Sequence, residues 1–596
     1  MAYKNKGLAP GGKIGLSRKK RNFASMIFSK PAIPGILLLC FLLFTPPIKA
    51  QDELLPQKHY PQGYFIYPVD ARVGLAANFG ELRRNHFHMG LDCRTDQQEN
   101  KRVLAAADGY ISRIKIEPFG FGRSISINHP NGLTSLYAHL NEFDPRIEKY
   151  LKTIQYEQKT WAITLPVPEG VLPVKKGEFI AYSGNTGGSM GPHLHFEIRD
   201  TKTEKVLNPL LFGFPIQDNI PPSILRLAVY DRRVSTYDYP PKLYPVKLIH
   251  GKYQTLPSKI MVSSDEVSFA ITAYDHYTGS TNQNGIYEAE IFEDGKPLCG
   301  FQLDSISYDE TRYLNAHIDY RTKALGGPYL QHLSQLPGYH DGVYHSNPGN
   351  GVIGLTDEAE HEISIKVYDT NGNERTLRFI LQKAGKTASL PPIPGQVFRP
   401  NEVNVFENEN VLLYLPENAL YDSFHFRFYQ IKTQPQPTYS LHNPSVPVHV
   451  YFPVMIKPGL AFKDTSKLVM KRYYGPKEDF KKADYFNGWY RAWFRELGNF
   501  QLIYDDIPPV ITPVGFHNGM NAARLHSIRF RVKDNTEEIP SFEAYLDGQW
   551  LRFSNDKAKD YIYTFDEKCP PGKHLLRVVV KDLAGNTTEK SYQFTR

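Results

Sequence analysis

Cysteine is scarce in this sequence, which contains four in 596 residues. Three of them, Cys93, Cys299 and Cys569, are far apart and odd in number, which excludes a disulfide framework. Stability must therefore come from hydrophobic cores, and the length allows three to five domains with a core each. We expect Cys93 to be a small buried residue.

Long apolar runs are lacking as well. The apolar run Ile36–Phe44 has nine residues and is too short to span a bilayer comfortably. Basic residues precede it and Ile48-Lys-Ala50 follows it, which is typical of a signal peptide cleaved before Gln51, with translation starting at Met1 or Met26. The mature chain is expected to have no stable membrane span and to be exported to the periplasm or cell envelope, or secreted.

An excess of positive charge is missing once this leader is set aside. The formal charge of the whole chain is +8, but residues 1–50 contain nine Lys or Arg and no acidic residue. Subtracting nine leaves −1 for the rest, so the electrostatic basis for nucleic-acid binding disappears. Tyr, Phe and Pro are abundant instead, with 38, 35 and 45 residues, and many segments alternate apolar and polar residues. This pattern predicts a mainly β protein.

The most informative segment is 184–199, a glycine-rich turn followed by strict alternation. His193, His195 and Glu197 lie on one face of the predicted strand and apolar residues on the other, the period of a half-buried strand. Two imidazoles at this spacing can serve one metal ion. Taken alone, such a pair is more often two polar residues on a solvated strand face.

A second group of metal-binding residue types lies upstream. His88 and Asp92 are four residues apart, and this even spacing places both on one side of an extended chain. A catalytic zinc ion takes three protein ligands and keeps its fourth position for water. His88, Asp92 and one histidine of the later pair would supply that set, and His139 lies between the two groups in another strand-like run.

Three motifs occur in a fixed order: His88-Met-Gly-Leu-Asp92, then Tyr137-Ala-His-Leu140, then a glycine-rich turn that leads into Gly191-Pro-His-Leu-His-Phe-Glu197. In this combination, residues 79–210 resemble the lysostaphin/LytM-type zinc endopeptidases of family M23, which cut peptidoglycan cross-links. The resemblance covers under a quarter of the chain. It implies an antiparallel β-sheet catalytic domain that binds Zn²⁺ and acts on peptidoglycan peptide stems.

The resemblance also implies roles for the matched residues. The zinc ligands would be His88, Asp92 and His195, and the unliganded general acid–base residues would be His139 and His193. Unliganded histidines suit that task because an ordinary imidazole pKa is about 6.5, and the sequence has no His-Glu-x-x-His motif to supply a glutamate base. Glu197 either accepts a hydrogen bond that orients one histidine or is a solvated carboxylate, and the sequence leaves both open.

Residues 141–173 depart from the family pattern. Asp144 is a good helix N-cap before Pro145, and Ile147, Tyr150 and Leu151 recur at helical spacing. An amphipathic helix at 144–158 is therefore predicted as an insertion after His139. It either selects the substrate or packs on the sheet.

The rest of the chain contains a repeat. Residues 218–224 and 505–511 are near copies, and the turns at 369–373 and 582–586 correspond as well. Short strands with regular turns predict modules that resemble bacterial Ig-like β-sandwiches. The predicted order is a signal peptide at 1–50, a LytM-type domain at 51–216, an Ig-like sandwich at 217–385 with an insertion at 297–355, a β-rich domain at 386–505 that would be a third sandwich, and an Ig-like sandwich at 506–596. Four histidines of the insertion are expected on the surface: His317, His332, His340 and His345.

The function predicted from these features is an exported zinc metalloendopeptidase. Two other classes stay open: an inactive LytM-like scaffold that activates another cell-wall hydrolase, and a wall-binding or adhesion protein whose sandwiches carry the function. The sandwiches contain no chemical site, so they are expected to position the enzyme or to bind an envelope protein. On this modular interpretation, residues 51–215 alone should cleave small soluble muropeptides.

Overall fold

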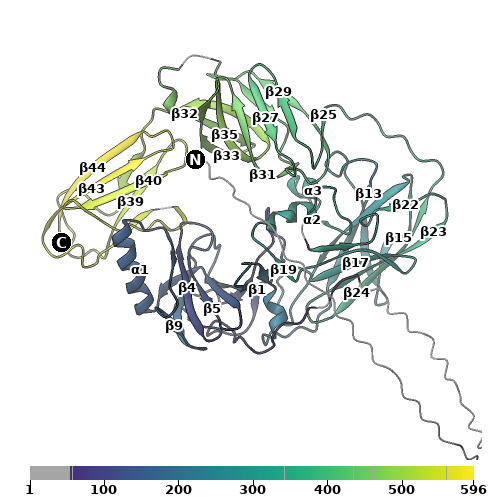
Figure 1. Ribbon diagram of the computed structural model, residues 1–596, viewed down its shortest axis with the longest axis horizontal. Coiled ribbons are helices and arrows are strands. Elements are labelled where there is room, and N and C mark those ends of the chain that lie inside the picture. Colours follow the sequence, from purple (N-terminus) through teal and green to yellow (C-terminus); the bar gives the residue numbers. More distant parts are fainter. Residues whose placement is uncertain (1–53, 57, 341, 434, 460–461, 559) are drawn as a thin grey trace, which may run out of the picture. The chain divides into compact units, whose positions relative to one another are not determined.

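The structure is a computed structural model that describes residues 54–56, 58–340, 342–433, 435–459, 462–558 and 560–596. The predicted signal peptide lies outside these residues. Strands dominate the fold (Figure 1), which confirms the mainly β class. Within the described ranges, no helix is long and apolar enough to cross a membrane.

The LytM-like region is built on one antiparallel sheet, and its strand order brings the predicted site segments together. β2 and β6 both pair with β11, so three segments far apart in the sequence become neighbours. The sheet order is β1 (Leu75–Ala77), β2 (Leu91–Arg94), β11 (His193–Asp200), β6 (Leu133–Ala138), β5 (Arg123–Asn128), β4 (Gly109–Ile116) and β8 (Ile163–Pro166), with β9 (Pro173–Val174) beside β4. A smaller sheet contains β3 (Arg102–Leu104), β10 (Phe179–Ser183) and β7 (Leu140–Phe143).

Strand β11 has the predicted alternation but not the predicted half-burial. Leu194, Phe196 and Ile198 are fully buried in the core of this region, as expected for the apolar face. On the opposite face, His195 and Glu197 are buried too, because other residues of the site and Tyr308 cover them. The polar face is therefore enclosed rather than solvated.

The inserted helix forms where the sequence predicts it. α1 spans Pro145–Gln158, and the Asp144 side chain caps it by accepting a hydrogen bond from the backbone N–H of Arg146. Ile147 and Leu151 are buried in the core beside the sheet. Packing on the sheet is thus shown for this helix, and substrate selection stays a prediction.

The outer face of α1 makes contacts that the sequence did not predict. Tyr156 Oη donates to Asp566 at 2.7 Å, and Lys152 Nζ lies 3.0 Å from the same carboxylate. Arg552 donates to Gln155 Oε1 at 2.9 Å. Since Arg552 and Asp566 belong to the last module, residues 506–596, the helix connects that module to the LytM-like region.

The first module, residues 217–385, shares a core with the LytM-like region. Phe79, Phe87 and Val206 lie in one hydrophobic cluster with residues of the first and middle modules. β12 (Val206–Leu207) also pairs with β19 (Ser305–Ile306) across the predicted boundary. The two regions are therefore joined by a continuous core.

An eleven-stranded sheet forms the frame of the first module. Its strands are β20 (Gln331–His332), β16 (Glu266–Tyr274), β13 (Ser223–Asp231), β14 (Lys242–Ile249), β15 (Lys252–Val262), β24 (Glu374–Lys383), β23 (Glu360–Tyr368), β17 (Glu288–Glu293), β18 (Lys296–Gln302) and β21 (Tyr344–Ser346), with β22 (Ile353–Gly354) beside β16. The insertion also contains η2 (Thr311–Tyr313), α2 (Leu314–His317) and α3 (Tyr320–Ala324).

The expectation that the insertion carries only surface histidines is wrong for two of them. His317 and His332 are fully buried. His317 is hydrogen-bonded to Gln331 and Tyr344. The reason is that the insertion contributes to the shared core instead of projecting into solvent.

The burial of His332 predicts an acid-sensitive core. Burial, helped by the positive charge of Arg232, lowers the pKa of His332 to about 3. In the unfolded chain the His332 imidazole becomes protonated below pH ~6.5, whereas in the folded chain it stays neutral until about pH 3. Between these two pH values, each unit of acidification therefore lowers the free energy of unfolding by up to ~1.4 kcal/mol. His332→Phe is expected to make the fall of the thermal unfolding midpoint between pH 7 and 4.5 shallower. Replacing the exposed His340 in the same way should leave the slope unchanged, and equal slopes in all three proteins would contradict the assignment.

The middle module, residues 386–505, has two five-stranded sheets, and the last module has a core of its own. The first of the two sheets contains β26 (Asn404–Glu407), β27 (Val411–Leu415), β31 (Pro447–Ile456), β35 (Trp489–Glu496) and β34 (Asp484–Phe486). The second contains β29 (Phe428–Ile431), β30 (Thr438–Leu441), β36 (Gly498–Tyr504), β32 (Leu468–Tyr474) and β33 (Lys477–Lys482). The module also contains the strand pair β25 (Gln396–Phe398) and β28 (Phe424–Phe426) and the turn η3 (Thr465–Lys467). The last module contains two sheets and the short helix η4 (Asp556–Ala558). One sheet contains β37 (Val510–Pro513), β39 (Ser527–Lys533) and β42 (Tyr561–Thr564), and the other contains β38 (Met520–Asn521), β44 (Thr587–Thr595), β43 (Lys573–Lys581), β40 (Ser541–Leu546) and β41 (Gln549–Trp550).

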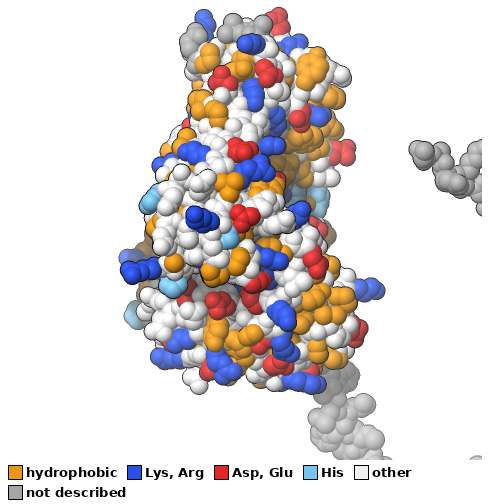
Figure 2. All heavy atoms as spheres, turned by 90° about the vertical axis from the view of Figure 1, so that its left-hand side faces the viewer, with side chains coloured by type: hydrophobic (Ala, Val, Ile, Leu, Met, Phe, Trp, Pro, Cys, Tyr) orange, Lys and Arg blue, Asp and Glu red, His pale blue; other side chains and the backbone are white. Residues whose placement is uncertain are grey.

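Lys and Arg side chains lie among Asp and Glu on the face shown in Figure 2, in keeping with the small net charge that the sequence indicates beyond the leader.

Candidate metal centre

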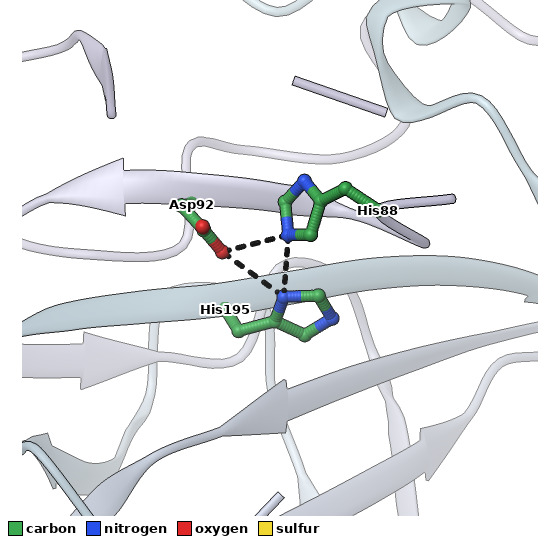
Figure 3. A group of neighbouring side chains, drawn as sticks. All are labelled: His88, Asp92 and His195. Carbon is green, nitrogen blue, oxygen red and sulfur yellow. Dashed lines mark hydrogen bonds and ion pairs between the residues drawn. The ribbon is translucent and has the colours of Figure 1, made fainter. Parts of the chain in front are cut away.

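Three side chains from two segments more than a hundred residues apart meet in a small triangle (Figure 3). His88 Nε2 lies 2.9 Å from Asp92 Oδ1 and 3.1 Å from His195 Nδ1, and the latter two atoms are 3.0 Å apart. Asp92 on β2 and His195 on β11 are direct partners in the sheet register. All three residues are buried.

His88 reaches the triangle from a loop and not from the extended chain that its spacing suggested. The segment before β2 folds back, with backbone hydrogen bonds from His88 N to Glu81 O and from Gly80 N to His88 O, both 2.8 Å. Gly90 allows the close approach, since a Cβ there would lie 2.5 Å from the carbonyl oxygen of Phe196 and 2.9 Å from the ring of His195. The glycine of the His-x-Gly-x-Asp motif is therefore needed for space beside β11.

The hydrogen-bond acceptors on the far side of the two imidazoles determine which ring nitrogen points its lone pair into the triangle. His88 Nδ1 donates to the carbonyl oxygen of Asn78 at 2.7 Å, and His195 Nε2 donates to Glu197 Oε1 at 2.9 Å. The neutral rings then present His88 Nε2 and His195 Nδ1 without protons. Two imidazole lone pairs and one carboxylate oxygen converge on one point. This donor set fits a zinc ion and leaves one tetrahedral position for water.

The charges of the site also favour a bound cation. Burial alone would lower the pKa of His195, but its hydrogen bonds to Asp92 and Glu197 outweigh burial and raise it to about 9. Burial likewise opposes ionisation of Asp92, yet the neighbouring histidines hold its pKa well below the usual value. The pocket is therefore built to stabilise positive charge, and a cation competes with a proton for His195 Nδ1.

His139 and His193 lie beside the triangle with their rings in similar settings. The Nδ1 atoms donate to backbone carbonyl oxygens, His139 to Thr186 at 2.9 Å and His193 to Gly191 at 2.8 Å. The two ring centroids are 4.8 Å apart, and His193 Nε2 is 3.3 Å from Asp92 Oδ1. Because Nδ1 of each ring is bound to a backbone carbonyl, Nε2 is the nitrogen that can exchange a proton.

The position of His139 depends on a break between two strands. Its backbone has φ of 60°, in the left-handed region that non-glycine residues rarely occupy, between the end of β6 and the start of β7. Burial and the nearby His195 and His193 lower its pKa to about 3. At neutral pH this imidazole is uncharged.

Glu197 is fully buried, and three donors surround it. Besides His195, the Arg199 Nε donates to Oε2 at 2.7 Å and the Tyr308 hydroxyl donates to Oε1. Sequence reasoning missed Tyr308, which comes from the insertion of the first module and has no motif to reveal it. Arg83, which precedes His88 in the sequence, contacts the site as well, with Nη2 3.4 Å from Asp92 Oδ2.

We expect Glu197→Gln to lower zinc affinity by roughly 10- to 100-fold, because the hydrogen-bond acceptor behind a ligating histidine sets its tautomer and basicity. Glu204→Gln is the matched control, since Glu204 also pairs with Arg199, at 3.2 Å, but is about half exposed and touches no ligand. Competition with a fluorescent zinc chelator measures both variants. Equal affinities for the two would contradict the role of Glu197.

Comparison with known proteins confirms the resemblance to the M23 peptidases. Residues 86–156 and 169–209 match the model of Peptidase family M23. Residues 395–505 of the middle module match that of a Zu5-like domain.

Relatives with described names share the peptidase region. An uncharacterized metalloprotease of Haemophilus influenzae is 29% identical over 26% of this chain and 28% of its own length. The DD-carboxypeptidase/endopeptidase Mpg of Neisseria meningitidis serogroup B is 32% identical over 26% of both chains. A zinc-containing peptidase from Vibrio cholerae, known from its crystal structure, is 25% identical over 26% of this chain and 41% of that one, with a TM-score of 0.20. The chain spans little more than a quarter of the length of the first two relatives.

Proposed function

We propose that this protein is an exported zinc metalloendopeptidase that hydrolyses the peptide cross-links of peptidoglycan. The observation that carries the proposal is the convergence of three possible ligand atoms, from His88, Asp92 and His195, with His139 and His193 beside them. The names of relatives support the substrate class, among them the peptidoglycan DD-endopeptidase ShyA of Vibrio cholerae. Export rests on the leader sequence.

Zinc, when bound by His88, Asp92 and His195, supplies a Lewis acid that polarises the scissile carbonyl and makes water acidic enough to attack near neutral pH. The chain itself must then move protons. His139 is neutral at pH 7 and presents Nε2, and His193 presents Nε2 next to Asp92. Together they can take the proton of the attacking water and return one to the leaving amine.

A cavity of about 400 Å³ beside the metal centre offers room for part of the substrate. Phe121, whose ring centroid is 5.8 Å from that of His195, forms one wall with Tyr308. Arg113, Lys115 and Arg199 line it as well. Glu204 and Asp309 line it too, and Glu204 pairs with both Arg113 and Arg199, so the cavity carries charges of both signs.

The modules beyond residue 216 would position the enzyme or bind an envelope protein. The last module contacts the glycine-rich turn before β11, where the N–H of Gly187 donates to Asp556 at 2.8 Å. Lys557 Nζ donates to Ser189 O at 2.8 Å in the same turn. A partner that binds the last module would therefore act on the turn that directly precedes His193.

Zinc analysis combined with digestion of purified cross-linked muropeptides tests the proposal. The full chain is expected to hold zinc and to convert muropeptide dimers to monomers, detected by mass, and Asp92→Ala should do neither. A zinc-loaded protein without product on muropeptides and intact sacculi would instead be the inactive scaffold. A protein that binds sacculi without holding zinc would be the adhesin.

A further inference from the structure

Two groups of aspartates occupy equivalent places in the first and last modules. In each group, one carboxylate oxygen from every residue lies within 4.8 Å of the others; the groups are Asp218, Asp275 and Asp369, and Asp505, Asp534 and Asp582. The first aspartate of each group belongs to the near-copied segment. The other two directly follow strands, β16 and β23 in the first module and β39 and β43 in the last. The repeat has therefore built the same carboxylate triad twice.

An asparagine amide makes equivalent hydrogen bonds to both triads. Asn373 Nδ2 donates to Asp369 Oδ2 at 2.7 Å and to the backbone oxygen of Asp218 at 3.4 Å. Asn586 Nδ2 donates to Asp582 Oδ2 at 2.8 Å and to the backbone oxygen of the other first aspartate, Asp505, at 3.0 Å. These amides hold the aspartates in place but leave other carboxylate oxygens unsatisfied.

Five of the six aspartates are buried, and Asp534 is partly buried. Asp218, Asp275 and Asp505 are 5%, 1% and 1% exposed. Among the described residues, no Lys, Arg or His forms an ion pair with any member of either triad. The oxygens without a hydrogen-bond partner are Asp218 Oδ2, Asp275 Oδ1, Asp505 Oδ2 and Asp534 Oδ1. Burying carboxylates in this way is costly unless a cation or protons neutralise them.

A neutral oxygen next to the first triad is unsatisfied too. Asn284 pairs with Asp275 through two backbone hydrogen bonds of 3.0 and 2.9 Å. Its side chain is 2% exposed, and its amide oxygen Oδ1 has no hydrogen-bond donor in the described part of the chain. A protonated carboxyl group would donate to this oxygen, and a cation would take it as a further ligand together with the unpartnered carboxylate oxygens.

We propose that each triad binds one Ca²⁺ ion. Oxygen-only ligands suit a hard cation, in contrast to the two imidazole nitrogens of the zinc centre. Ca²⁺ binds oxygen at about 2.3–2.6 Å, so two ligands of one ion lie up to ~5 Å apart, which agrees with the observed spacing. Mg²⁺ is less suitable because it usually keeps several waters and a strict octahedron.

Both sites lie at module junctions. Asp218 lies between η1 (Pro209–Phe212), which ends the LytM-like region, and β13 of the first module. Asp505 directly follows β36, the last strand of the middle module. A bound ion ties each connecting segment to two strand ends of the module that follows, and thereby stiffens the junction.

The test uses the full chain, stripped of metals with a chelator and reloaded with one equivalent of zinc. Calorimetric titration with CaCl₂ and metal analysis after gel filtration should both give two Ca²⁺ per chain. Asp275→Asn and Asp534→Asn should each retain one, and the double variant none. The matched control is Asp357→Asn in an exposed turn, which should retain two. Millimolar Ca²⁺ should also raise the thermal unfolding midpoint of the wild-type chain more than Mg²⁺ does.

Two results would overturn the proposal. One is a wild-type chain that binds no Ca²⁺ at millimolar concentration and whose unfolding midpoint does not change, a measurement that stands even if a variant misfolds. The other is an Asp275→Asn variant that keeps the same Ca²⁺ content and unfolds at a higher temperature. That outcome would mean that the carboxylates share protons instead of an ion.

Discussion

His195→Ala is expected to lose most of its zinc, whereas His193→Ala and His139→Ala are expected to keep it near one equivalent per chain. The first change leaves only His88 and Asp92 as ligands, and two ligands hold zinc poorly. The other two changes remove rings whose Nδ1 atoms are bonded to backbone carbonyls and whose Nε2 atoms lie outside the ligand triangle. Metal analysis of the three purified proteins separates the two classes.

Turnover should fall in all three variants, but for different reasons. Without His193 or His139, turnover on muropeptide dimers is expected to fall by roughly two to four orders of magnitude, the scale of a lost general acid or base. Added zinc should not restore it. A zinc-free His193→Ala alongside a zinc-loaded His195→Ala would reverse the ligand assignment. Zinc and full activity retained in all three would show that hydrolysis does not depend on this site.

Local sequence pattern pointed to His88, Asp92 and one histidine of the later pair, and the resemblance to the M23 peptidases selected His195. The structure places these three side chains together. The motifs that contain His88, Asp92 and His195 are short, and β2 and β11 place two of the ligands directly opposite each other. The loop that carries His88 was not predicted, because it depends on a backbone contact between Gly90 and Phe196. Even spacing could suggest a shared side but not a fold-back.

Long-range packing was beyond the reach of the sequence pattern. Tyr308 lies more than a hundred residues from Glu197 in the chain, and nothing around it marks a partner of a metal site. His317 and His332 resemble scattered surface histidines because burial in a shared core has no periodic signal. The aspartate repeat was visible in the sequence, yet Asp275 and Asp534 lie outside the repeated landmarks, so the triads could not be assembled before the strands were placed.

The fold argues against the modular interpretation, in which residues 51–215 are active by themselves. Phe79, Phe87, Met89 and Val206 are almost completely buried, in one cluster with the first and middle modules. A fragment of residues 54–216 would expose much of this surface, at about 1.5–3 kcal/mol for each fully buried side chain. That loss approaches the whole net stability of a typical domain, about 5–15 kcal/mol.

We therefore expect the 54–216 fragment to aggregate or to unfold without a cooperative transition, and to hold little zinc. It would also lose the pairing of β12 with β19 and the Tyr308 hydrogen bond to Glu197. The matched control is a fragment of residues 54–505, which lacks only the last module. That module has a separate core and contacts α1 and the glycine-rich turn through hydrogen bonds and ion pairs.

The longer fragment should consequently fold cooperatively and hold zinc near one equivalent per chain. Size-exclusion chromatography, thermal unfolding and metal analysis of both fragments decide the matter. A monomeric 54–216 fragment with a sharp unfolding transition and full zinc would show that the shared core is dispensable. Failure of both fragments would show instead that the contacts of α1 with Asp566 and Arg552 are part of the folding unit, and that the peptidase region depends on every module that follows it.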